Sequence, residues 1–175
     1  MNTTGVIRKI DDLGRIVIPK EIRKTLKIRN GESLEIFIDK DMVALKRYCP
    51  MDELKIMAAT LVESFYQTSH KIILITDRDN FIACPEAYRK TYWNKPVSSF
   101  VESLMEEGVP LKVMEEENVE LLTGKSIECA YAAYPIMEDQ GLVGLVILIS
   151  DSKLNDGDLQ LVQGFSNFLG KYIEE

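Results

Sequence analysis

The chain has few of the residues that carry metal and nucleophilic chemistry. It holds one histidine, His70, and three widely spaced cysteines, Cys49, Cys84 and Cys129, with no Cys-x-x-Cys pair. This set argues against a zinc site and a disulfide framework, so we expect buried or bystander thiols, with a regulatory thiol as the alternative. His70 lacks a nucleophile partner at a recognisable spacing and is expected at the surface.

Long apolar runs are also missing. The longest spans Leu142 to Ile149, far below the roughly 20 residues that a membrane helix needs. The N-terminus lacks the charged-then-apolar layout of a signal peptide. We therefore expect a cytoplasmic protein that does not engage a membrane.

Two short motifs suggest chemistry only weakly. Gly124-Lys125-Ser126 resembles the end of a phosphate-binding loop but lacks the preceding glycine. Glu115-Glu116-Glu117 offers oxygen ligands to a cation, although a charge run is more often solvated. No catalytic constellation is left, so we expect no enzyme, no metal and no cofactor.

Charge is distributed unevenly along the chain. The net charge is −7, yet residues 1–30 hold eight basic and three acidic side chains. At physiological salt the Debye length is about 8 Å, so acids on a separate domain are screened from a polyanion bound at the N-terminus. The asymmetry predicts a polyanion-binding head joined to a body with a different role.

The balance changes sign near Pro50, from +4 over residues 1–50 to −11 over the remainder. Pro50 ends a strand, and Asp52 can cap a following helix. We expect a head at 1–50, a linker helix at 51–69 and a body at 70–175.

The head shows short β-like segments around one helix. The helix is expected from Lys20 to Leu26, with Pro19 in its first turn and Gly31 just beyond its end. Strands are expected at Thr4–Ile10, Arg15–Ile18, Leu34–Asp39 and Met42–Arg47. Such a unit buries too little apolar surface to be stable alone, so two copies should share a core. Its residues would be Val6, Ile16, Ile18, Leu34, Ile36, Ile38, Val43 and Leu45.

The basic side chains of the head gather on one side. At 100° per residue, the helix places its lysines and arginine on one stripe, with Ile22 and Leu26 opposite. A guanidinium can bridge guanine O6 and N7 or grip a phosphate, whereas lysine acts as a point charge. A solvated surface is the alternative; we favour double-stranded DNA as the partner. The predicted contacts are Arg8, Lys9, Arg15, Lys20, Arg23, Lys24 and Lys27.

Residues 52–68 have apolar positions spaced 4, 3, 4 and 3, at Leu54, Ala58, Leu61, Phe65 and Thr68. This is a heptad seam of two repeats. Either the helix packs on its own domain, or it pairs protomers.

The remainder predicts an α+β sandwich. One hairpin is expected over Lys71–Thr76 and Phe81–Cys84, and a second strand pair over Ala130–Met137 and Leu142–Ser150. Helices are expected at Glu86–Trp93, at Ser98–Glu107 and after the capping pair Asn155 and Asp158, while Glu115–Thr123 is ambiguous.

The run from Thr4 to Ile28, followed by Leu34-Glu35-Ile36-Phe37, closely resembles the AbrB family of bacterial transition-state regulators. The resemblance implies a swapped-hairpin β-barrel that two chains interleave to form. The family's DNA-binding arginines fall on Arg8, Arg15 and Arg23. The next one is Lys24 here, which keeps the charge but loses the bidentate fork.

The segment from Tyr134 to Leu148 resembles the central strand pair of GAF domains. The combined resemblance implies a nucleoid-associated regulator of sporulation genes, an activator or repressor, with a GAF-like body that assembles a tetramer and senses an unidentified small molecule. Tyr88, Tyr92, Trp93 and Tyr131 either line a pocket or belong to the core. The alternative function is an antitoxin-like interaction module, since related swapped-hairpin proteins neutralise toxins.

Overall fold

The computed structural model describes residues 5–49, 51–139 and 141–173, without the side chains of Asp52 and Glu53. The chain divides into two compact units, Met1–Tyr48 and Cys49–Glu175, which we call unit 1 and unit 2. Thr4 and Pro50, which carry part of the expectations above, lie outside the described residues.

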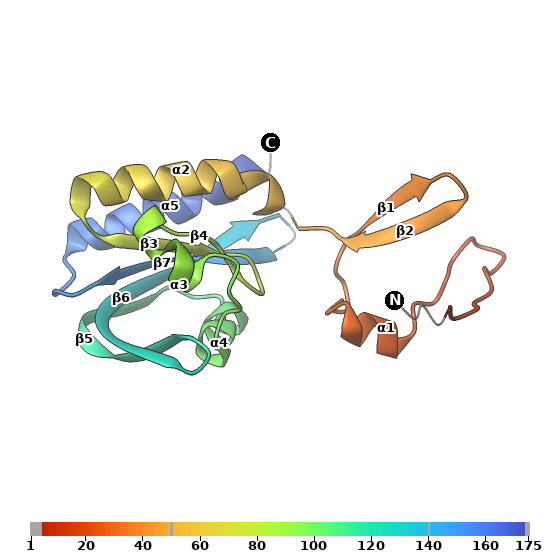
Figure 1. Cartoon of the computed structure of the whole chain (residues 1–175), viewed down its shortest axis with the longest axis horizontal. Coiled ribbons are helices and arrows are strands. Elements are labelled where there is room, and N and C mark those ends of the chain that lie inside the picture. Colours follow the sequence, from red (N-terminus) through yellow and green to blue (C-terminus); the bar gives the residue numbers. More distant parts are fainter. Residues whose placement is uncertain (1–4, 50, 140, 174–175) are drawn as a thin grey trace. The chain divides into compact units, whose positions relative to one another are not determined.

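Unit 1 contains one short helix and one hairpin (Figure 1). The helix α1 spans Lys20–Thr25, and the strands β1, Leu34–Asp39, and β2, Met42–Arg47, pair antiparallel. The strands expected at 4–10 and 15–18 are wrong for this single chain, because residues 5–19 form no strand. A strand needs a neighbour for its backbone hydrogen bonds, and no described segment pairs with these residues.

Helix α1 ends earlier than expected. The backbone N–H of Lys27 donates to Lys24 and that of Ile28 donates to Arg23, while Lys27 adopts a positive φ of 54°. This is the Schellman arrangement, in which the residue in the left-handed region is usually glycine. Lys27, and not Gly31, therefore stops the helix.

The hairpin of unit 1 has an uncovered apolar face. Its register pairs Ile36 with Leu45 and Ile38 with Val43, so all four side chains lie on one face. All four are exposed, and none of the described residues of unit 1 is buried.

Unit 2 is built on a five-stranded antiparallel sheet in the order β4-β3-β7-β6-β5. The strands are β3, Ile72–Thr76; β4, Phe81–Ala83; β5, Leu111–Leu122; β6, Lys125–Glu138; and β7, Gly141–Ser150. The expected hairpin and second strand pair are confirmed, and the ambiguous acidic segment belongs to β5. Thr123 and Gly124 form the turn from β5 to β6, and Lys125 begins β6, so Gly124-Lys125-Ser126 is not a phosphate loop.

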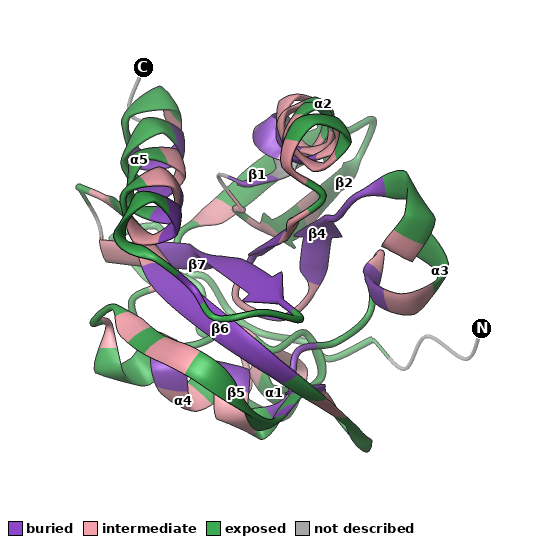
Figure 2. Ribbon diagram, turned by 90° about the vertical axis from the view of Figure 1, so that its left-hand side faces the viewer, coloured by how far each residue is buried: buried purple, intermediate pink, exposed green. Residues whose placement is uncertain are grey.

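Helices cover both faces of this sheet (Figures 1 and 2). The helices α2, Met51–Ser69, and α5, Asp156–Ile173, pack on one face through a core that includes Leu54, Val62 and Leu169. The short η1, Glu86–Tyr88, and α3, Arg89–Tyr92, with α4, Ser99–Glu107, cover the other face. Two-sided coverage explains why β7 is buried from Val143 to Ser150.

The start of α5 carries the capping pair that the sequence predicts. The backbone N–H of Asp158 donates to Asn155 Oδ1 at 3.1 Å, and that of Asn155 donates to Asp158 Oδ2 at 2.9 Å. Asp158 also pairs with Lys71 at the start of β3, although the two residues are 87 positions apart. The cap therefore also ties the last helix to the sheet.

Candidate nucleic-acid interface

The seven predicted contact residues all lie in unit 1, on three different segments. Arg8 and Lys9 are exposed in the extended segment before residue 11, Arg15 follows a turn, and Lys20 and Lys24 are exposed on α1. Arg23 is only half-buried, and Lys27 lies just beyond the helix. The stripe on α1 is thus shorter than expected, because Lys27 has left the helical path.

Asp11 organises the turn that precedes Arg15. Its Oδ1 accepts the backbone N–H groups of Leu13 at 3.0 Å and Arg15 at 2.8 Å, and its carbonyl accepts that of Gly14 at 2.9 Å. Gly14 has a φ of 76°, which a glycine adopts without strain. All these bonds join residues at most four positions apart, so the turn forms locally.

The carboxylate of Asp11 also holds the side chain of Arg15. Arg15 Nε donates to Asp11 Oδ2 at 2.7 Å, with the side chains 71% and 43% exposed. The hydrogen bonds from the Arg15 backbone, followed by that from its side chain, hold the pKa of Asp11 below its ordinary value. The carboxylate is therefore ionised at neutral pH.

Arg23 is held differently. Its Nη1 donates to Asn30 Oδ1 at 2.6 Å, and its Nε is buried without a hydrogen-bond partner among the described residues. An unpaired buried donor is costly. The guanidinium of Arg23 therefore has less freedom to reach a ligand than the guanidinium of Arg8, which is exposed to solvent.

Sequence reasoning missed the two residues that hold these arginines, Asp11 and Asn30. An acid four positions before an arginine, with a glycine between them, is a usable signal for Asp11. The pairing of Arg23 with Asn30 spans the end of α1, and depends on the turn that Lys27 makes there.

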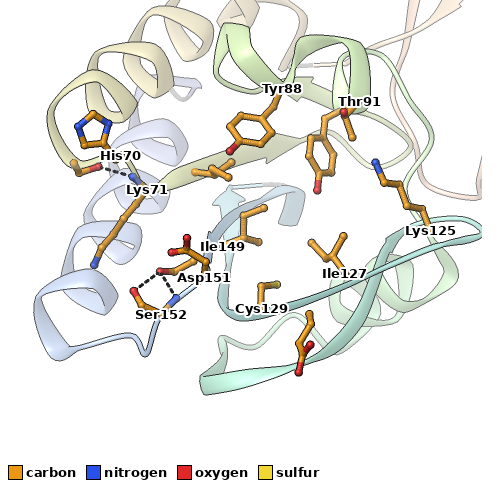
Figure 3. A pocket seen from close by; sticks show the side chains of 15 residues that line it. His70, Lys71, Tyr88, Thr91, Lys125, Ile127, Cys129, Ile149, Asp151 and Ser152 are labelled. Atoms are coloured by element: carbon orange, nitrogen blue, oxygen red, sulfur yellow. Dashed lines mark hydrogen bonds between the residues drawn. The ribbon is translucent and has the colours of Figure 1, made fainter.

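Unit 2 contains a cavity of about 490 Å³ at one end of the sheet (Figure 3). Ile127, Cys129 and Ile149 line it from the strands, and Tyr88 and Thr91 from η1 and α3. Charges of both signs also line it, at Lys71, Lys125, Glu128 and Asp151.

The aromatic residues predicted for a pocket separate into two groups. Tyr88 and Tyr92 line the cavity, whereas Trp93 and Tyr131 do not. Tyr92 and Tyr131 are buried in the core, and burial raises the pKa of Tyr92 to about 12. The Tyr131 hydroxyl donates to Glu117 at 2.8 Å. Both alternatives thus apply within the set, and Tyr92 satisfies both.

The other reactive groups form no second site. Cys84 and Cys129 are buried, and burial raises the pKa of each thiol to about 11, so both are protonated at neutral pH. His70 is exposed as expected and packs edge-on against Tyr66. No group of potential metal ligands is present within residues 5–49, 51–139 and 141–173. None of the helices seen there is long and apolar enough to span a membrane.

Two family models match the chain. The model described as stage V sporulation protein T C-terminal, transcription factor, matches residues 53–174. The model described as antidote-toxin recognition MazE, bacterial antitoxin, matches residues 7–48. The two matches meet at the division between the units.

Curated relatives match the whole chain and its first part. The chain is 36% identical over 178 residues to stage V sporulation protein T of Bacillus subtilis (strain 168), with 100% of both chains covered. It is 50% identical over 50 residues to the transition state regulatory protein AbrB of the same organism, which covers 29% of this chain and 52% of that protein.

Among solved structures, the cofactor binding GAF domain of the nutrient sensor CodY from Clostridium difficile has a TM-score of 0.52 and 13% identity. The match covers 88% of this chain and 94% of that chain. At this identity the likeness shows the fold alone, and it confirms the GAF-like architecture expected for unit 2.

Proposed function

Because the chain belongs to the stage V sporulation protein T family of transcription factors, we propose that it regulates sporulation genes from a DNA-binding head that two chains build together. Family membership confirms a transcription factor with an AbrB-like head and a GAF-like body, and not an enzyme. In the proposal, residues 1–50 dimerise and bind DNA at the nucleoid. Residues 51–69 form the linker helix, and residues 70–175 assemble the tetramer and sense a small molecule.

The uncovered apolar face of unit 1 carries the proposal of a shared head. Ile38 is 81% exposed and Ile7 is 92% exposed, an arrangement that a stable isolated unit avoids. A second copy, laid against the hairpin, would cover this face and give residues 5–10 a strand to pair with. We expect residues 1–50 to sediment as a dimer at micromolar concentration; a folded monomer would contradict the proposal.

A shared head presents every basic residue twice. The contacts proposed are Arg8, Lys9, Arg15, Lys20, Arg23, Lys24 and Lys27, on both chains of the dimer. If these groups neutralise six to ten phosphates, affinity falls about a thousandfold or more between about 50 and 200 mM salt. An affinity for DNA that does not change with salt concentration would contradict an interface built on phosphate contacts.

Genome-wide mapping of bound DNA tests the contacts directly. Arg8→Ala and Arg15→Ala should reduce occupancy at the sites that the wild-type chain occupies, because each removes a charge-assisted hydrogen bond from both halves of the head. Arg89→Ala is the matched control: this exposed arginine of unit 2 lies over the Trp93 ring at 4.4 Å and should leave occupancy unchanged. Equal occupancy for all variants would remove the arginines of unit 1 from the interface.

Assembly of a tetramer is proposed through α2 and α5. These helices lie side by side, joined by an edge-on contact of Phe65 and Phe165 at 5.7 Å (Figure 2). Phe168 and Tyr172 of α5 are 46% and 48% exposed, and a second dimer would cover them. Phe168→Asp with Tyr172→Asp should halve the mass of the full chain in sedimentation equilibrium; an unchanged mass would place the contact elsewhere.

The cavity of unit 2 supports a small-molecule role. Its volume suits a metabolite-sized ligand, and apolar walls with a few charged groups are typical of such sites. Ile127→Trp should fill it. Native mass spectrometry of the chain purified from its own cells should detect a bound small molecule in the wild type and not in this variant. If the wild-type chain shows no mass beyond that of the protein, the cavity holds no ligand in the cell and this part of the proposal is contradicted.

An antitoxin-like role is the second candidate, because residues 7–48 match an antitoxin model. Antitoxins of this class carry a segment that wraps a toxin, whereas residues 51–173 form a packed body with two apolar cores. The DNA mapping above separates the two. A toxin-neutralising module would rescue growth of toxin-expressing cells, with or without the arginines of unit 1.

A further inference from the structure

Arg15 differs from the other arginines of the proposed contact set, because its guanidinium forms an ion pair with Asp11. Its Nε donates to Asp11, while neither Nη has a partner among the described residues. A guanidinium presents five donors in one plane. The edge formed by the two Nη groups is therefore the edge left for a phosphate or for guanine O6 and N7.

The support for this arrangement comes from the turn itself. Asp11 Oδ1 accepts the backbone N–H groups of Leu13 and Arg15, and its Oδ2 accepts the Arg15 side chain. Because Oδ1 is anchored to the backbone, Oδ2 has a defined position, and Arg15 Nε is directed to it. The carboxylate thereby couples the backbone of the turn to the direction of the guanidinium.

We propose that Asp11 is a positioning residue, which fixes the Arg15 guanidinium in the orientation that meets DNA. The proposal rests on the proposed function, in which Arg15 contacts DNA. Arginine has many rotamers in solution, and binding must select one of them. A side chain that is already ordered loses less freedom on binding, so preorganisation raises affinity.

Electrostatics alone predicts the opposite effect. A carboxylate beside a phosphate-binding arginine repels DNA, so its removal should strengthen binding. Asp12 provides the matched comparison, because it is the next residue, is exposed, and has no hydrogen bond to Arg15. Asp11→Asn and Asp12→Asn remove the same charge from neighbouring positions. Only Asp11→Asn disturbs the guanidinium, because the amide NH₂ of asparagine would replace Oδ2 and cannot accept the hydrogen bond from Arg15 Nε.

The test is the affinity of the full chain for a duplex recovered from the genome-wide mapping. Asp12→Asn should raise affinity by a few fold, because it only removes a repulsive charge. Asp11→Asn should lower affinity about tenfold, because two arginines per head lose their preorganised state. If both substitutions raise affinity equally, the positioning proposal is overturned.

A double-mutant comparison separates this proposal from the contact on which it rests. In the Arg15→Ala background, Asp11→Asn should no longer weaken binding and should act like Asp12→Asn. Loss of affinity in both backgrounds would overturn the proposal, since the effect would not pass through Arg15. Arg15→Ala without effect in the wild-type chain would refute the DNA contact itself.

A thermal melt controls for folding. Asp11→Asn retains the Oδ1 acceptor for the backbone N–H groups of Leu13 and Arg15, so the turn should survive. We expect the melting temperature to change little while affinity falls. A parallel loss of both would show that Asp11 acts by holding the head together and would overturn the positioning role.

Discussion

The β1–β2 hairpin of unit 1 and the β6–β7 pair of unit 2 are both antiparallel and both contain branched apolar side chains. Their surroundings differ. Ile38 in β1 is mostly in solvent, whereas Ile147 in β7 is completely buried. Strand β7 has a strand on each side and helices on each face, while β1 and β2 have only each other.

This difference shows that the sequence of a strand does not decide whether it is covered. Apolar side chains on a sheet face need a second layer. Unit 2 supplies that layer from its own chain, through α2 and α5 on one face and α3 and α4 on the other. Among its described residues, unit 1 has only the six residues of α1 as a helix, none of them buried, so its apolar face has no second layer from this chain.

A charge placed in the uncovered face of unit 1 should have the largest effect. In a shared head, Ile38→Asp would bury two unpaired carboxylates per dimer, each at a cost of several kcal/mol. We expect residues 1–50 to become monomeric, with a dissociation constant raised at least about a thousandfold, and the full chain to lose DNA binding.

Val109→Asp is the control for that substitution, since Val109 is an exposed apolar residue of unit 2, 57% accessible. It should leave head dimerisation and DNA binding intact. If Ile38→Asp behaves like this control, the uncovered face does not pair with a second copy.

The ion pair of half-buried Lys71 with buried Asp158 tests whether unit 2 is stabilised from within its own chain. Lys71→Met leaves Asp158 buried without its cation, which should lower the free energy of unfolding by about 3 to 5 kcal/mol. Lys71→Met combined with Asp158→Asn should recover part of that loss. Urea unfolding of the full chain measures both, and a change below about 1 kcal/mol would mean that solvent screens the pair.

A close backbone approach gives a smaller effect in the same unit. A Cβ at Gly144 would lie 2.0 Å from the Thr76 carbonyl oxygen, so Gly144→Ala should destabilise unit 2 by about 2 to 3 kcal/mol. Gly164 in α5 has open space around it, and Gly164→Ala should instead stabilise by up to about 1 kcal/mol, through helix propensity. The thermal melts of the two variants should therefore move in opposite directions.

The smallest effect concerns the end of α1. Lys27→Gly relieves a positive φ and should stabilise unit 1 by about 1 kcal/mol, while it removes one proposed phosphate contact per chain. Lys27→Ala removes the same charge without relieving φ, so only the glycine variant should melt at a higher temperature. The slope of affinity against salt should decrease equally in both. Equal melting temperatures would show that the left-handed residue carries no strain.

Some elements of the fold were predicted correctly from the sequence. The cap at Asn155 and Asp158, the hairpin over residues 72–83 and the closing helix are all present as predicted. Two other segments were not decided by the sequence. Residues 5–10 lack the strand that was predicted for them, and the acidic segment near Glu115, which was ambiguous, is a strand. A strand depends on its neighbour, which a pattern within one segment does not reveal.

The candidate interface shows the same limit. Residue type and spacing were enough to select the arginines of unit 1, but not to tell that Arg15 is held by Asp11 and Arg23 by Asn30. The cavity was foreseen only in part, since Tyr88 and Tyr92 line it while Trp93 and Tyr131 do not. All four rings belong to the same apolar core, so which of them reach the cavity depends on how η1 and α3 pack against the strands.

The features that arise within a few residues could be predicted from the amino-acid sequence alone: the division of charge, the helix cap of α5 and the tight turns. These depend on bonds between near neighbours, which form wherever the chain carries the right side chains. The pairing of Lys71 with Asp158, the cover on both faces of β7 and the open apolar face of unit 1 become visible only in the folded chain. Such contacts join distant segments, so they depend on which surfaces the whole fold brings together.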